Sequence, residues 1–146
     1  MRTLGILGGM SWESTLSYYK GINVGVRDRL GGLSSAPLII HSFEFSQIAK
    51  LQKSGEWEKA GELLANAALN LQNAGAEGIV LATNTMHKVC GQIVDKISIP
   101  FIHIADATAN SLKEIGVKKV GLLGTAFTME QEFYISAITN KHGFTV

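Results

Sequence analysis

Residues 74–87 read Ala-Gly-Ala-Glu-Gly-Ile-Val-Leu-Ala-Thr-Asn-Thr-Met-His, and this stretch decides the fold. Gly75 follows a long helical pattern, residues 78–81 form a short apolar run, and the polar residues 83–85 follow almost at once. A short apolar run between a helix-ending glycine and a helix-capping segment is typical of a buried strand that turns directly into a helix. The stretch therefore predicts a helix–strand–helix unit of a parallel sheet.

The same alternation of short apolar runs and helical patterns continues along the chain. The clearest helix is residues 56–73, where apolar side chains recur at helical spacing. The pattern predicts an α/β fold, a parallel sheet flanked by helices, with ligands bound at the carboxyl ends of the strands. Strands are predicted at residues 4–7, 37–40, 78–81, 100–104 and 119–123, and helices at residues 11–29, 56–73, 85–96 and 106–115.

A faint internal repeat divides the 146 residues into two parts. Residues 4–9 and 120–125 both read as a strand that ends in glycine and opens into a helix. The repeat predicts an N-terminal α/β lobe over residues 1–116 and the beginning of a second lobe over residues 117–146. Because one strand and one helix cannot cover both faces of a sheet, we expect further sequence to complete this second lobe.

Composition narrows the class of protein and its environment. Hydrophobic residues make up 46% and charged residues 17%, and the net charge is +1 without any block of like charges. This balance predicts a compact domain that binds a small molecule and neither nucleic acid nor a membrane surface. No apolar run approaches the roughly 18 residues that span a bilayer. The single cysteine, Cys90, excludes an internal disulfide and indicates the cytoplasm.

Residues taken one at a time leave alternatives open. Gly8-Gly9 fails the spacings of the phosphate-binding glycine motifs, so a tight turn is the simpler interpretation. Residues 83–85 have an alternative role as a helix N-cap cluster. The histidines match no metal-ligand spacing and more often bond loop carbonyls, although His87 lies close enough in sequence to modulate Thr83. Cys90 is best interpreted as a buried structural residue.

Taken together, several segments resemble the aspartate/glutamate racemase family over residues 3–134, particularly its bacterial branch with broad specificity for acidic amino acids. The first helix also carries a tyrosine pair, Tyr18-Tyr19, and Gln52 follows the second strand. The matching segments occur in a fixed order: LGGMSWEST (7–15), AGAEGIVL (74–81), TNTMHKV (83–89), IPFIHIADAT (99–108) and LLGT–TMEQ–FY (122–134).

The resemblance implies a two-lobe fold with a pseudo-twofold axis, with substrate between the lobes and no pyridoxal phosphate or metal. It implies proton removal on one face of the α-carbon and delivery on the other. In most members both proton-transfer groups are cysteines, but this chain has Thr83 in place of the first cysteine. A threonine hydroxyl is far less acidic than a thiol, whose pKa is about 8.5. The resemblance therefore implies that racemisation runs faster in one direction than in the other. It also implies that the second cysteine lies on a lobe outside these residues.

The family resemblance also assigns binding roles. Asn84 and Thr85 would hold the α-carboxylate, Gln52 would reach the far end of the substrate, and Thr125 would close over the carboxylate. The closest alternatives are a hydantoin racemase or maleate isomerase, and a different kind of protein would be a flavodoxin-like binding module. Family members are commonly homodimers. The predicted catalytic residue is Thr83, and the predicted substrate-binding residues are Gly9, Met10, Ser11, Gln52, Asn84, Thr85 and Thr125.

Overall fold

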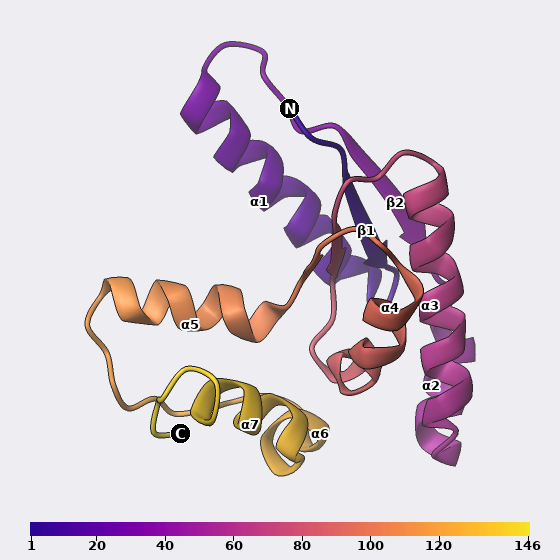
Figure 1. Cartoon of the computed structure of the whole chain (residues 1–146), viewed down its shortest axis with the longest axis vertical. Coiled ribbons are helices and arrows are strands. Elements are labelled where there is room, and N and C mark those ends of the chain that lie inside the picture. Colours follow the sequence, from indigo (N-terminus) through magenta and orange to yellow (C-terminus); the bar gives the residue numbers. More distant parts are fainter.

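A computed structural model describes all residues 1–146, and its centre is a four-stranded parallel sheet (Figure 1). The strand order is β2-β1-β3-β4, so the chain extends the sheet to one side of β1 and then crosses to the other side. All strands run in the same direction, and their carboxyl ends therefore meet at one edge. The strands are β1 (Leu4–Gly8), β2 (Leu38–Ser42), β3 (Ile79–Leu81) and β4 (Phe101–Ile102).

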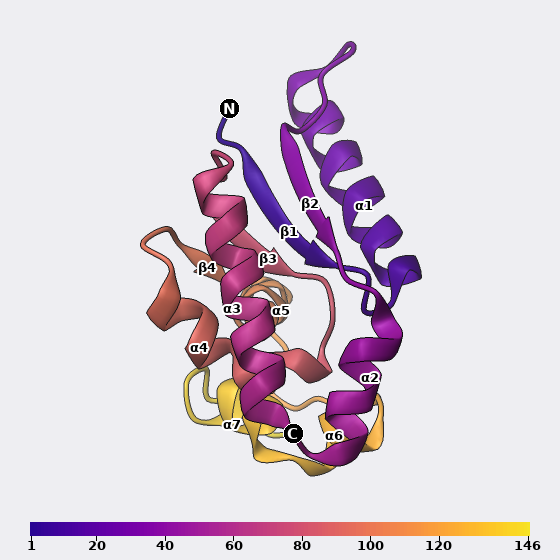
Figure 2. The ribbon, with the colours of Figure 1, turned by 90° about the vertical axis from the view of Figure 1, so that its right-hand side faces the viewer.

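Helices cover both faces of this sheet, as the predicted α/β class requires (Figure 2). Helix α1 (Trp12–Leu30) lies on one face, where Tyr18 and Ile22 pack against the buried Ile6 and Val80. Helices α3 (Trp57–Asn73) and α4 (Cys90–Lys96) cover the other face. Apolar side chains of the interior strands β1 and β3 point to both faces of the sheet, and on each face they contact apolar side chains of the covering helices.

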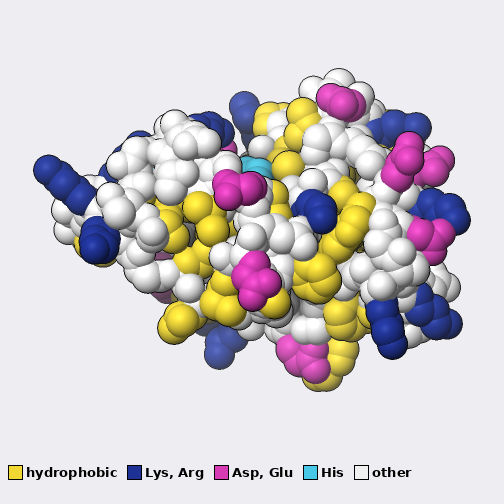
Figure 3. Space-filling view, turned by 90° about the horizontal axis from the view of Figure 1, so that it is seen from below, with side chains coloured by type: hydrophobic (Ala, Val, Ile, Leu, Met, Phe, Trp, Pro, Cys, Tyr) yellow, Lys and Arg dark blue, Asp and Glu magenta, His cyan; other side chains and the backbone are white.

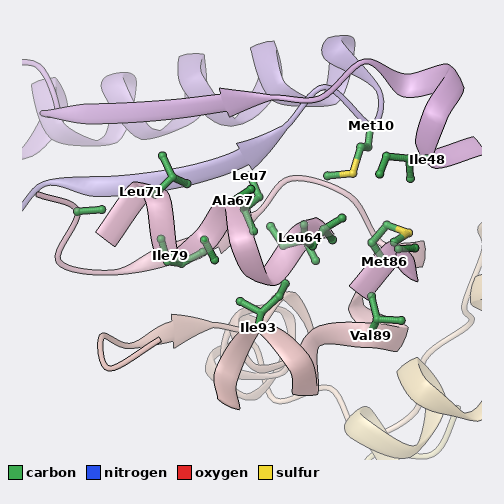
Figure 4. Close-up of a cluster of buried hydrophobic side chains, with 14 residues drawn as sticks. Leu7, Met10, Ile48, Leu64, Ala67, Leu71, Ile79, Met86, Val89 and Ile93 are labelled. Atoms are coloured by element: carbon green, nitrogen blue, oxygen red, sulfur yellow. The ribbon is translucent and has the colours of Figure 1, made fainter. Parts of the chain in front are cut away.

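The main hydrophobic core lies between the sheet and α3 (Figure 4). Leu64 and Leu71 of α3, spaced seven residues apart and therefore on one helix face, meet Leu7 and Ile79 from the sheet. Met10, Ile48 and Met86 lie at the end of this cluster near the carboxyl ends of the strands. This packing gives the candidate site a rigid floor.

A second, smaller cluster lies beside the sheet, where α5 (Ile104–Glu114) packs on α7 (Glu132–Thr139). Ala105 and Ala109 of α5 meet Tyr134 and Ile138 of α7. A short helix, α6 (Ala126–Glu130), precedes α7. The division into residues 1–116 and 117–146 stays a prediction.

The predicted strand at residues 119–123 was wrong. This segment makes one isolated bridge, between Lys119 and Thr145, and joins no sheet. An apolar run becomes a strand only when a neighbouring strand satisfies its backbone groups, and no strand lies beside this run. The repeat of residues 4–9 at residues 120–125 therefore keeps the helix that follows each segment, α1 in one case and α6 in the other, but not the strand.

Three other elements differ from the prediction. Strand β4 is shorter than residues 100–104, because His103 already caps α5 through a bond from the Ala105 N–H. The predicted helix at residues 85–96 begins as a 3₁₀ helix, η1 (Thr85–Val89), before α4. Helix α2 (Phe45–Ser54) was not predicted, because its cap is Glu44, an uncommon N-cap residue.

The face in Figure 3 carries lysine and arginine side chains together with aspartate and glutamate side chains. Figure 3 shows apolar side chains across the middle of one face, with most lysine and arginine side chains toward its two ends. None of the helices combines the length and apolar character that crossing a bilayer requires.

Candidate active site

A cleft of about 680 Å³ opens at the carboxyl edge of the sheet. Its first wall follows β1, with Met10 and Ser11, and its second wall follows β3, with residues 82–85. In a parallel sheet, a ligand site is expected where the strand order reverses, which here is between β1 and β3. The cleft lies at that point. It brings together seven of the eight predicted site residues: Met10, Ser11, Gln52, Thr83, Asn84, Thr85 and Thr125.

The segment after β3 presents polar side chains that the fold itself does not use. Asn84 is the N-cap residue of η1, yet its side chain makes no capping hydrogen bond. The Thr83 backbone carbonyl accepts a bond from His87, and Thr83, Asn84 and Thr85 all line the cleft. The interpretation of residues 83–85 as a capping cluster therefore does not explain these side chains, and they are available to a ligand.

Gly9 is the one predicted residue that does not line the cleft. Its φ is +83°, and its N–H donates to the Thr15 hydroxyl at 2.8 Å, in a buried position. The same hydroxyl donates to the Ser11 carbonyl at 3.1 Å. Thr15 therefore ties both sides of Met10 to helix α1 and fixes the first wall of the cleft.

We expect Thr15→Val to destabilise the protein by about 1 to 3 kcal/mol, because it leaves the buried Gly9 N–H without a partner. Valine keeps the shape of threonine, so the loss of stability measures the contribution of the hydroxyl alone. Urea denaturation measures the effect. Ser17→Ala is the matched control: its exposed hydroxyl bonds the Glu13 carbonyl, and the expected change is within about 0.5 kcal/mol. Equal, small changes in both variants would contradict this role of Thr15.

Further walls come from α2 and from α6 with the segment before it, and α1 and α5 also contribute lining residues. Gln52 of α2 lines the cleft, and its Nε2 contacts the Met86 sulfur at 3.0 Å. Thr125 is the N-cap residue of α6, and its hydroxyl pairs with that of Thr128 at 3.3 Å. Helix α6 is further held to α3 by an edge contact between the Phe127 and Trp57 rings, 5.6 Å between centroids.

Several cleft residues were not among the predicted site residues. Tyr18 follows Ser11 by seven positions and so lies on the same face of α1, a signal that the sequence does contain. Burial, and secondarily Tyr134, raise the pKa of its phenol. Phe45 was missed because α2 was not predicted. The additional lining residues are Ser14, Tyr18, Phe45, Ala82, Ile104, Gly124, Ala126, Phe127 and Thr128.

Two histidines near this edge, His87 and His103, bond backbone groups. His87, in η1, lies near Thr83 as its sequence position suggested: its Nδ1 is 2.8 Å from the Thr83 carbonyl oxygen, and it makes no bond to the Thr83 hydroxyl. His103 accepts from the Ala105 N–H. No group of three metal-ligating side chains is present. Cys90 does not line the cleft, and burial raises the pKa of its thiol, so it is a weaker nucleophile than an ordinary cysteine.

A smaller cavity of about 200 Å³ lies between α5, α7 and residues 120–122. Six of its eight lining residues are hydrophobic, so it offers few groups for proton transfer or for binding an anion. The polar cleft at the sheet edge is therefore the candidate active site.

Comparison with known proteins defines the class. The model of the Asp/Glu/hydantoin racemase family matches residues 7–146, and the chain therefore belongs to this family. The resemblance inferred from the sequence motifs is confirmed.

Individual relatives agree with this assignment. A Yersinia pestis protein, whose crystal structure was solved as that of a candidate Asp/Glu racemase, is 53% identical, with a TM-score of 0.95 over 100% of this chain and 64% of its own. An aspartate racemase homologue from Pyrococcus horikoshii is 38% identical, with a TM-score of 0.89 and the same two coverages. The broad-specificity amino-acid racemase RacX of Bacillus subtilis is 27% identical over 90% of this chain. The chain spans 58% of RacX and 64% of each of the two structures.

Proposed function

We propose that this chain forms one half of the active site of a cofactor-independent racemase acting on aspartate or glutamate. The observation that carries the proposal is the segment after β3, where Thr83, Asn84 and Thr85 line the cleft and the side chain of the N-cap residue Asn84 makes no capping bond. Polar groups held rigidly by a fold but unused by it are suited to binding a substrate, because they need no reorganisation when it arrives.

The chemistry requires two groups on opposite faces of the α-carbon. An amino-acid α-hydrogen is a very weak acid, so the carbanion-like state needs stabilisation by preorganised donors at its carboxylate. We assign this role to Asn84, Thr85 and the backbone N–H groups beside them. A cysteine thiolate removes the α-proton from one face, and the Thr83 hydroxyl relays a proton from solvent water to the other face, taking up one proton as it gives up another. We assign that cysteine to the part of the longer relatives that this chain does not span.

The relatives support the choice of substrate class. The Yersinia and Pyrococcus proteins carry the names of acidic amino-acid racemases, whereas RacX is named for broad specificity. Gln52 is the predicted contact for the far end of the substrate, and it lies on the cleft wall. An amide N–H of this kind donates to a side-chain carboxylate oxygen.

Solvent deuterium tests the proposal. In D₂O, the complete protein with its second lobe should incorporate deuterium at the α-carbon of aspartate or glutamate during inversion, as followed by proton NMR and chiral chromatography. Residues 1–146 alone should produce no inversion, because they lack the thiolate. If a hydantoin exchanges its hydrogen and neither amino acid does, the substrate is a hydantoin and not an acidic amino acid. Turnover by residues 1–146 alone would contradict the two-lobe mechanism.

A further inference from the structure

His87 occupies a buried position between the two strand ends that border the cleft. It lies in η1 with 2% of its surface exposed. Its Nδ1 lies 2.8 Å from the Thr83 carbonyl, and its Nε2 accepts from the Ile104 N–H at 3.3 Å. Thr83 follows β3 and Ile104 follows β4, and both line the cleft. One imidazole thus joins two neighbouring walls of the site.

The two bonds allow only one form of the ring. A carbonyl oxygen can only accept, so Nδ1 must carry the hydrogen, and a backbone N–H can only donate, so Nε2 must be bare. An imidazolium would place an N–H of Nε2 against the N–H of Ile104 and would break that bond. The geometry therefore requires the neutral Nδ1–H tautomer.

The surroundings favour that neutral form. The His103 ring lies edge-on with its centroid 4.5 Å away, and the Phe101 ring lies at 5.8 Å. His103 is the titratable group facing His87, and its own Nδ1 is used to cap α5. Burial first, and His103 second, lower the pKa of His87 to about 4. The ring is thus neutral over the range in which the enzyme is expected to work.

We propose that His87 is the positioning residue for Thr83: by fixing the Thr83 carbonyl, it directs the Thr83 hydroxyl into the cleft. The inference rests on the proposed function and extends it to a residue that does not touch substrate. Threonine is β-branched, so its side chain has few rotamers once the backbone is fixed. A rotation of the Thr83 peptide would therefore move the hydroxyl away from the α-carbon, and small displacements of this kind slow a reaction strongly.

Matched variants of the complete protein test the role. His87→Leu removes both bonds, whereas His87→Asn retains a donor near the Nδ1 position. We expect His87→Leu to lower kcat at least about tenfold with little change in KM, and His87→Asn to restore most of the loss. His41→Gln, on the edge strand β2 and outside the cleft, should leave kcat unchanged. Equal kcat values for the leucine and asparagine variants, per folded molecule, would overturn the proposal.

A spectroscopic measurement separates this inference from the proposed function. The ¹⁵N shifts of the His87 ring in histidine-labelled protein should show a protonated Nδ1 and a bare Nε2 down to about pH 5. The opposite tautomer, or an imidazolium at pH 6, would overturn the His87 assignment whether or not the protein racemises amino acids. Absence of α-hydrogen exchange with the predicted ring shifts intact would instead remove the proposed function.

Discussion

Replacing Thr83 with alanine is expected to slow the interconversion of the two enantiomers by about 100-fold or more, because the variant lacks the group that serves one face of the α-carbon. The two enantiomers have equal free energies, so kcat/KM must remain equal in the two directions. The asymmetry of the threonine–cysteine pair therefore appears elsewhere. The enantiomer whose α-hydrogen faces the thiolate should still exchange it with D₂O, while the other should not. NMR of each enantiomer in D₂O measures this difference.

Thr83→Ser is the matched control for this experiment. Serine retains the hydroxyl at the cleft, so interconversion should stay close to that of the unaltered protein. Equal and mild losses of exchange for both enantiomers of Thr83→Ala would show that the residue only supports the loop after β3. The absence of a side-chain cap at Asn84 already argues against an N-capping role for this segment.

Gly9→Ala is expected to destabilise the protein by roughly 4 kcal/mol. Gly9 has a φ of +83°, and a Cβ there would lie 2.4 Å from the Phe43 carbonyl oxygen and 2.5 Å from the Phe43 nitrogen. Both are backbone atoms of the connection between β2 and α2, so the clash cannot be relieved by a side-chain rotation. The clash pushes the loop that carries Met10 away from this connection, and the cleft loses its first wall. Urea denaturation measures the destabilisation.

Gly55→Ala is the control that separates the effect of the steric clash on stability from the effect of backbone strain. Gly55 has a similar φ of +74°, but nothing lies within 4 Å of the position of its Cβ. Its substitution should cost only the strain of a left-handed backbone, about 1 to 2 kcal/mol. A Gly9→Ala variant no less stable than Gly55→Ala would mean that the loop after β1 adjusts freely, which would contradict the rigid first wall described above.

Much of the fold could be predicted because its signals are local. Helix α3 begins one residue from the predicted start and ends at the predicted residue, since its apolar stripe is long and regular. Strands β1 and β3 are short apolar runs beside glycines, and both lie in the sheet interior. The strand predicted at residues 119–123 carries the same local signal but lacks a partner strand. The local sequence predicts the tendency of a segment to form a strand, whereas pairing with a neighbouring strand decides whether the strand forms.

The candidate site was predictable to the extent that it follows strand ends. Thr83 and Met10 line the same cleft because β1 and β3 are adjacent and parallel. This arrangement follows from the fold class. The contact between Gln52 and Met86 was not predictable, because it depends on how α2 lies relative to η1. The bonds of His87 to two different strand ends were likewise beyond the sequence, which suggested only its proximity to Thr83.

A crystal structure of the complete protein with L-aspartate or L-glutamate bound tests the central claim most directly. We predict that the substrate lies in the cleft between β1 and β3, with its α-carboxylate at Asn84 and Thr85 and the Thr83 hydroxyl oxygen within about 3.5 Å of the α-carbon. A bound substrate with the Thr83 side chain turned away from the α-carbon would contradict it.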